Sequence, residues 1–100
     1  MNQLWIKNLA TYKTNITLIA GSGYIVYEAA KILNDSKKLN NIILIADNKK
    51  IKKEFKSIIT IFDIKNIEDI VSYLKKNNYN RVLLMGYVKL PPIKDLKLSI

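Results

Sequence analysis

The chain has 100 residues, of which 49% are hydrophobic and 25% are charged, as is typical of one small globular domain. It contains neither cysteine nor histidine, so disulfide frameworks, thiolate zinc sites, cysteine nucleophiles and the serine–histidine triad are excluded. The net charge of +9 would suit nucleic acid, an anionic membrane surface or a phosphorylated ligand.

That charge comes from lysine rather than arginine. Sixteen of the 17 basic residues are lysines, and they occur with seventeen isoleucines and eleven asparagines. All three residue types have A/T-rich codons, so a skewed genome accounts for most of the excess charge. A specific nucleic-acid site favours the bidentate fork of arginine, and the sequence has only Arg81. We therefore expect no specific nucleic-acid partner.

No run of residues in the sequence is long and apolar enough to span a membrane. The longest uncharged stretch, residues 14–27, has fourteen residues, whereas a spanning helix needs about 20 mostly apolar ones. Residues 1–13 lack the apolar core and cleavage site of a secretory signal. We therefore expect a cytoplasmic protein.

Four short apolar runs predict β-strands. Residues 16–20, 42–46 and 81–85 are continuously apolar or nearly so, and residues 58–62 are rich in β-branched side chains. Continuous rather than alternating runs are typical of parallel strands that are covered on both faces. The positions predicted to be most buried are Leu18, Ile43, Leu44, Leu83 and Leu84.

The segments between these runs predict helices. Residues 24–37 place Tyr24 and Tyr27 on one stripe, which favours packing roles for both, and residues 64–76 repeat apolar side chains at spacings of three and four. We predict Asp63 as the N-cap of the second helix and Asn77-Asn78 as its stop. Residues 47–56 are predicted to form a loop or one short helix.

Strands that alternate with helices indicate right-handed crossovers and a parallel sheet. The sequence therefore predicts an α/β, Rossmann-like parallel sheet of about four strands, with helices on both faces. This domain is expected to occupy residues 15–100, and residues 1–14 to form an N-terminal extension or an extra edge element.

Ligands of open α/β sheets bind beyond the carboxyl ends of the strands, where Gly21, Ser22 and Gly23 follow the first run. The glycines permit close backbone approach, and the next helix offers unpaired N–H groups to an anion. A dinucleotide fingerprint would need a third glycine where Val26 stands. The loop is therefore interpreted either as an anion site or as a tight strand-to-helix turn. Asp47, after the second run, could hold a ribose, but a surface acid is the favoured interpretation.

A second glycine loop follows the fourth run. Gly86 could bring the backbone close to a ligand and Lys89 could supply a cation, although a purely structural role for this loop is equally open. The lysine-rich run 49–56 is interpreted as a solvated face. No pair of carboxylates has a spacing that predicts a catalytic site.

Two motifs together carry a family resemblance: Ile-Ala-Gly-Ser-Gly at residues 19–23, and Met-Gly-Tyr-Val-Lys-Leu-Pro-Pro-Ile-Lys-Asp-Leu at residues 85–96. With this order and separation, the chain resembles the N-terminal domain of LpxI, the UDP-2,3-diacylglucosamine pyrophosphatase of lipid A biosynthesis. Asn66 falls near the family's usual Gly-Gln pair. Lys89 and Leu90 replace an arginine pair, which weakens one expected phosphate contact and removes another.

The resemblance implies a substrate-binding half rather than a complete enzyme. The family's hydrolytic chemistry is assigned to a C-terminal domain, which would hold a divalent metal, expected to be Mg²⁺, and convert UDP-2,3-diacylglucosamine to UMP and lipid X. In this half, substrate and phosphate contacts are expected from Gly21, Ser22, Gly23, Asn66, Gly86 and Lys89, none of them a catalytic acid or base. Expected partners are the glycolipid substrate, the C-terminal domain and, peripherally, the inner membrane.

An alternative function is also open. The glycine loop and Asp47 would suit a stand-alone nucleotide- or dinucleotide-binding module of Rossmann-like fold.

Overall fold

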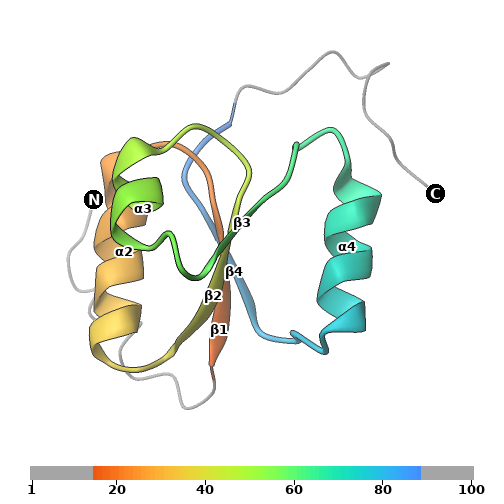
Figure 1. The fold of residues 1–100 in the computed structure, drawn as a ribbon, viewed down its shortest axis with the longest axis horizontal. Helices are drawn as coiled ribbons and strands as arrows, with labels where there is room; N and C mark the ends of the chain where they lie inside the picture. The colour runs from red at the N-terminus through yellow and green to blue at the C-terminus, as the bar shows by residue number, and fades with distance from the viewer. Residues whose placement is uncertain (1–14, 89–100) are drawn as a thin grey trace.

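The computed structural model describes residues 15–88, and the predicted extension at residues 1–14 lies outside that range. Four parallel strands form one sheet in the order β3-β2-β1-β4, with helices on both faces (Figure 1). The predicted α/β Rossmann-like fold is thereby confirmed. The elements in chain order are β1 (Ile16–Ala20), α2 (Tyr24–Asp35), β2 (Leu39–Leu44), α3 (Lys49–Glu54), β3 (Ile59–Ile61), α4 (Ile67–Lys76) and β4 (Val82–Met85).

β2 begins three residues earlier than the apolar run predicts. Its register against β1 shifts between Ile16 and Thr17, which pair with Leu39 and Asn41. Beside the shift, the Thr17 hydroxyl donates to Asn41 Oδ1 at 2.7 Å inside the protein, while Asn41 Nδ2 is buried without a hydrogen-bond partner among the described residues. β2 thus extends beyond its apolar residues through a polar pair that is only partly satisfied.

One face of the sheet packs against α2 and α3. α2 buries Val26, Ala29, Ala30 and Leu33, which recur at spacings of three and four and form one stripe. Tyr24 precedes this stripe by two residues, about 200° around the helix, and is 66% exposed. Its predicted packing role is therefore wrong, whereas Tyr27 does pack against the core as a partly buried side chain.

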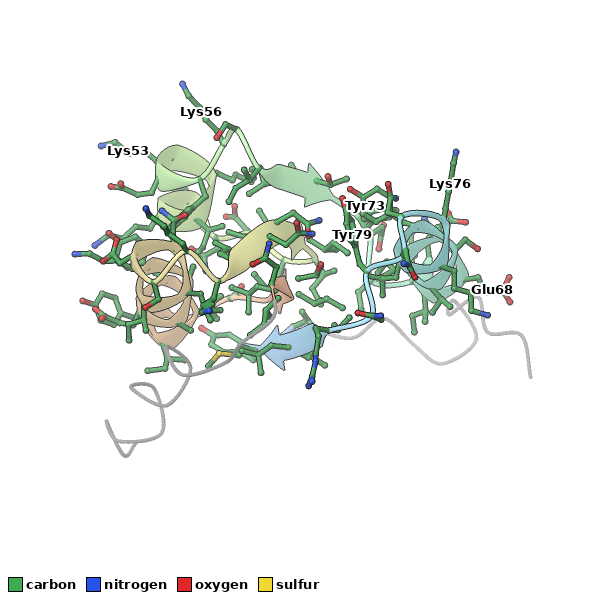
Figure 2. The ribbon with its side chains drawn as sticks, turned by 90° about the horizontal axis from the view of Figure 1, so that it is seen from below. Lys53, Lys56, Glu68, Tyr73, Lys76 and Tyr79 are labelled. Carbon is green, nitrogen blue, oxygen red and sulfur yellow. The ribbon has the colours of Figure 1, made fainter. Side chains whose placement is uncertain are left out.

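The predicted loop or short helix at residues 47–56 is the helix α3. It has six residues and buries Ile51, which joins the same core as α2. Lys53 of this helix and the nearby Lys56 project from this end of the molecule (Figure 2).

The other face packs against α4 through a smaller core. Ile70 of α4 lies with Ile43 and Ile45, and Tyr73 packs edge-on against Phe62 and Tyr79 with ring centroids 5.3 and 5.9 Å away (Figure 2). These contacts place α4 over the β2 side of the sheet.

The start of α4 differs from the prediction. The N-cap is Asn66 and not Asp63, because Asp63 forms the preceding turn. Its carboxylate accepts from the Lys65 N–H, and its carbonyl accepts from the Asn66 N–H. The predicted stop is confirmed, since Asn77 is the C-cap and Asn78 has a φ of 56°.

β4 lies at an edge of the sheet, and this position changes its burial. Leu18, Ile43 and Leu44 are fully buried as predicted, but Leu83 is only half-buried and Leu84 is 67% exposed. The prediction for Leu84 is wrong. Leu84 lies on the face of the sheet that packs against α4, but α4 covers the β2 side of that face and leaves the end of β4 exposed. Within residues 15–88, no helix has the length and apolar character needed to cross a membrane.

Candidate functional site

The glycine loops after β1 and β4 meet at the carboxyl edge of the sheet. The Ser22 N–H donates to the Tyr87 carbonyl at 2.8 Å, and the Tyr87 N–H donates back to the Ser22 carbonyl at 3.1 Å. The Gly21 N–H also donates to the Met85 carbonyl at 2.8 Å. The structure therefore brings together Gly21, Ser22, Gly23 and Gly86, four of the six predicted site residues.

Two of the glycines are required by the contact between these loops. A Cβ at Gly21 would lie 2.7 Å from the Tyr87 carbonyl oxygen, and a Cβ at Gly86 would lie 2.6 Å from Val26 Cγ2. Gly86 also has a φ of 92°, which side chains disfavour. Loop packing alone thus accounts for both residues, and this was one of the two interpretations left open for each loop.

Val26 explains why the dinucleotide fingerprint is incomplete. It is fully buried in the first turn of α2, and its Cγ2 occupies the space beside Gly86. In a dinucleotide fold a glycine at this position permits close packing between helix and strand. Here the helix contributes the side chain of Val26 to this contact, and the glycine comes instead from the end of β4, as Gly86.

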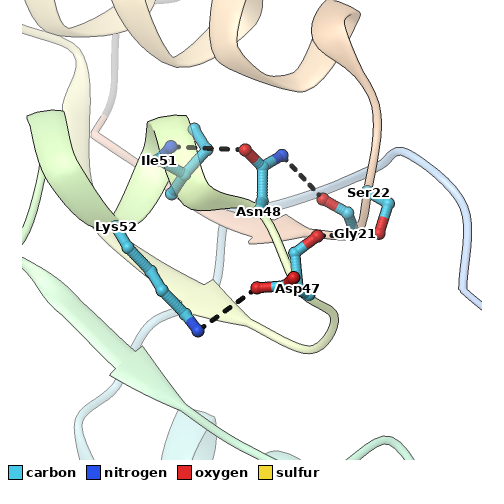
Figure 3. A network of polar contacts seen from close by, with 6 residues as sticks. All are labelled: Gly21, Ser22, Asp47, Asn48, Ile51 and Lys52. Carbon is cyan, nitrogen blue, oxygen red and sulfur yellow. Dashed lines mark hydrogen bonds and ion pairs between the residues drawn. The ribbon is translucent and has the colours of Figure 1, made fainter.

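A third loop, between β2 and α3, is tied to the first by side chains (Figure 3). The Ser22 hydroxyl donates to the Asp47 carbonyl at 2.9 Å, and Asn48 Nδ2 donates to the carbonyls of Gly21 and Gly23 at 3.1 and 3.3 Å. Asn48 Oδ1 accepts from the Ile51 N–H at 3.2 Å and so caps α3. One amide side chain therefore holds both the glycine loop and the start of α3.

Asn48 was not among the predicted site residues. Its signal was local: an asparagine directly before a lysine-rich segment that could form a helix is a preferred N-cap. The two bonds to the glycine loop join residues more than twenty positions apart, and no local pattern predicts them.

The first turn of α2 faces this edge, and within residues 15–88 no side chain caps its N–H groups. Its N-cap is Gly23, with a φ of 120°, and no acidic residue lies in the first turn. Free N–H groups at a helix start, together with the helix dipole, favour an anion. This interpretation of Gly23 agrees with the anion-site hypothesis.

A lysine and two tyrosines stand beside this turn. Lys50 Nζ lies 4.3 Å from the centroid of the Tyr27 ring and 5.5 Å from that of Tyr24, within the range of cation–π attraction. A hydrogen bond with Glu28, and the negative charge of that carboxylate, raise the pKa of Tyr24.

Of the other two predicted site residues, the structure describes only Asn66, and it is not joined to these loops. Asn66 begins α4, beyond the end of β3, and among residues 15–88 no hydrogen bond links it to the glycine loops. Lys89 lies outside the described residues. Asp47 contributes its carbonyl to the loop network, whereas its carboxylate is exposed and pairs with Lys52 at 3.4 Å; the surface-acid interpretation agrees with this arrangement.

The described residues do not fit a divalent metal. Asp47 and Asp63 line the same groove of about 480 Å³, but their carboxylates pair with Lys52 and Lys65 at 3.4 and 3.8 Å. Nowhere in residues 15–88 do three acidic side chains gather as ligands.

Comparison with known proteins identifies one family. The model of the LpxI N-terminal domain matches residues 15–100. No curated protein and no solved structure matches the chain.

Proposed function

The chain belongs to the LpxI N-terminal domain family, and we propose that it is the substrate-binding half of a UDP-2,3-diacylglucosamine pyrophosphatase of lipid A biosynthesis. The observation that carries the proposal is the family match, which includes every residue of the three loops at the carboxyl edge. The free donors at the start of α2 support it, because the substrate's pyrophosphate is an anion.

In this proposal the loop residues have different roles. Gly23 and the first turn of α2 receive a phosphate, while Gly21 and Gly86 let the two glycine loops pack closely enough to form the surface. Ser22 positions the loop through its bond to the Asp47 carbonyl. Lys89 is expected to add a cation.

The hydrolytic step belongs to the other half of the enzyme. Water attacks one phosphorus of the pyrophosphate, and UMP and lipid X are the products. A C-terminal domain would supply the divalent metal, expected to be Mg²⁺, and any acid or base, since the described residues here offer no such cluster. A consequence of the proposal is that the chain acts in the cytoplasm, at the inner membrane where its glycolipid substrate resides.

The test measures UMP release from UDP-2,3-diacylglucosamine. We expect no appreciable release by the chain alone and metal-dependent release once it is combined with an LpxI C-terminal domain. Turnover by the chain alone would contradict the assigned division of labour. Absence of turnover in the combined protein would contradict the proposed substrate.

Two variants of the combined protein test the site itself. Gly23→Val should weaken substrate binding by blocking approach to α2, and Lys89→Ala should raise KM about ten- to a hundredfold through loss of one charged hydrogen bond. Lys76→Ala, on α4, is the matched control for charge. Unchanged kinetics in both test variants would remove the loops from the substrate site.

The stand-alone nucleotide-binding alternative is tested by separate titrations with NAD and UDP. We expect the chain to bind UDP in preference to NAD. Submillimolar binding of NAD without binding of UDP would establish the alternative instead.

A further inference from the structure

An exposed apolar groove lies beside the glycine loops. Tyr24, Leu84 and Tyr87 are 66%, 67% and 70% exposed, and all three line one groove of about 510 Å³ between the start of α2 and the end of β4. Scattered exposed apolar residues are ordinary, but a contiguous patch of them marks a binding surface. The volume lies within the usual range of ligand pockets.

Among residues 15–88, the lining of this groove carries no charge. Besides the three exposed residues, the described lining consists of Ser22, Gly23, Ile25, Met85 and Gly86. The Ser22 hydroxyl already donates to the Asp47 carbonyl. In the described lining, what remains for a ligand is aliphatic and aromatic surface with the Tyr87 hydroxyl, since the Tyr24 hydroxyl is paired with Glu28. This suits a hydrocarbon chain better than a nucleobase, whose polar edge needs several hydrogen-bond partners.

A cation stands at one side of the groove. Tyr24 lines the groove, and Lys50 Nζ lies 5.5 Å from the centroid of its ring. The same Nζ lies 4.3 Å from the centroid of the Tyr27 ring. Among residues 15–88 the ion pairs are Lys52–Asp47 and Lys65–Asp63. The Lys50 ammonium forms no ion pair there, although the Glu28 carboxylate also lies beside Tyr24.

We propose that this groove binds the hydrocarbon chain of an anionic amphiphile, with the negative headgroup directed toward Lys50. A neutral apolar groove next to a held cation is complementary to such a molecule and to neither a free nucleotide nor a simple anion. The identity of the amphiphile rests on the proposed function, in which the substrate carries acyl chains; the groove would then be an acyl subsite. The preference for a hydrocarbon chain rests on the groove alone.

The first measurement is calorimetric titration of the 100-residue chain with octyl, decyl and dodecyl phosphate below their micellar concentrations, and with inorganic phosphate. Each added methylene should tighten binding about two- to fourfold, because burial of one methylene contributes about 0.8 kcal/mol when it is complete. Inorganic phosphate should bind more weakly than any of the alkyl phosphates. An affinity independent of chain length would overturn the proposal.

Two pairs of variants locate the ligand. Leu84→Ser should weaken dodecyl phosphate about five- to tenfold and leave inorganic phosphate unchanged, whereas its control Val71→Ser, on α4, should change neither. Both residues are exposed, so both variants should fold. Lys50→Ala should weaken all the alkyl phosphates by a common factor of about three to ten and keep the dependence on chain length. Lys53→Ala, on the same helix but projecting away from the body (Figure 2), is its control.

Other occupants would give different results. One such result is that UDP and dodecyl phosphate compete with each other and that Leu84→Ser weakens the binding of both. This would indicate a nucleobase site and overturn the proposal. Equal losses in Leu84→Ser and Val71→Ser would also overturn it, since the groove would then have no special role.

The experiment separates this inference from the proposed function. Chain-length-dependent binding without UMP release in the combined protein would leave the groove as an amphiphile site and remove the assigned substrate. Release of UMP with a KM for UDP-2,3-diacylglucosamine that Leu84→Ser does not change would retain the function and remove the acyl subsite.

Discussion

On one face of the sheet, α2 and α3 close over strands whose side chains are almost entirely withdrawn from water. On the other face, α4 covers Ile43 and Ile45, while Val82 and Leu84 of β4 remain 44% and 67% exposed. In the described residues the first core holds twelve buried side chains and the second three. Stability therefore depends mainly on the first face, and the exposed end of β4 is free to contact a ligand.

The unequal cover follows from strand order. β1 and β2 are central in the order β3-β2-β1-β4, and β4 has a neighbour on one side only. One helix cannot cover four strands, because a helix with its side chains is about 10 Å wide and adjacent strands lie about 4.8 Å apart. The apolar residues of β4 are thus exposed by geometry rather than by composition.

The largest expected effect is in the first core. Leu18→Ala should lower the free energy of unfolding by about 2–5 kcal/mol, because Leu18 is fully buried in the central strand and its truncation leaves a cavity. Urea denaturation followed by circular dichroism measures this. A loss below about 1 kcal/mol would show that the first face does not dominate stability.

The next effect concerns the loops that close this face at the carboxyl edge. Gly86→Ala should cost about 2–4 kcal/mol, since it combines a φ of 92° with a Cβ 2.6 Å from Val26 Cγ2. The double variant Gly86→Ala with Val26→Ala should recover part of the loss that the clash causes. Failure to recover any stability would mean that the positive φ and the contacts of the new Cβ with the Ser22 and Gly21 backbone, at 2.7 and 3.0 Å, outweigh the contact with Val26.

Asn48 should have a smaller effect with two separable parts. Asn48→Ala should cost about 1–2 kcal/mol, because it removes the cap of α3 and the donor to Gly21 and Gly23. Asn48→Asp keeps the capping oxygen but sets a carboxylate oxygen against the carbonyls of Gly21 and Gly23, so it replaces the bond between the loops by a repulsion. Equal stability of the Asp variant and the parent in urea would show that the cap is the whole contribution.

The smallest effect is expected on the exposed part of the other face. Leu84→Ala should change the free energy of unfolding by less than about 0.5 kcal/mol, because a side chain 67% exposed has little buried surface to lose. The same urea titration compares it directly with Leu18→Ala. A loss above 2 kcal/mol would mean that Leu84 is covered in solution, and the contrast between the two faces would fail.

Most of the fold could be predicted because its signals are local. The continuous apolar runs predict strands, and the alternation with helical segments predicts parallel crossovers; both agree with the structure. Boundaries were less predictable where a distant partner decides them. β2 reaches back to Leu39 because Asn41 accepts from Thr17, and α4 starts at Ile67 because Asp63 turns the chain before it.

The candidate site was partly predictable for the same reason. Glycine–serine–glycine after a strand is a local pattern that indicates Gly21, Ser22 and Gly23, and the glycine directly after the fourth apolar run indicates Gly86. Asn48 and Tyr87 were not predicted as site residues, because their roles depend on contacts between loops. One such contact is the bond from the Ser22 N–H to the Tyr87 carbonyl.

The sequence by itself determined the fold class, the parallel sheet and the family, because periodicity, β-branched runs and glycine spacing are properties of short segments. Tertiary structure alone decided that Leu84 is exposed, that Val26 and Gly86 share one space, and that Tyr24 links an apolar groove to Lys50. Those facts depend on which strand lies at the edge and on which residues far apart in the chain become neighbours. Burial and proximity are properties of the packed molecule, and no segment carries them alone.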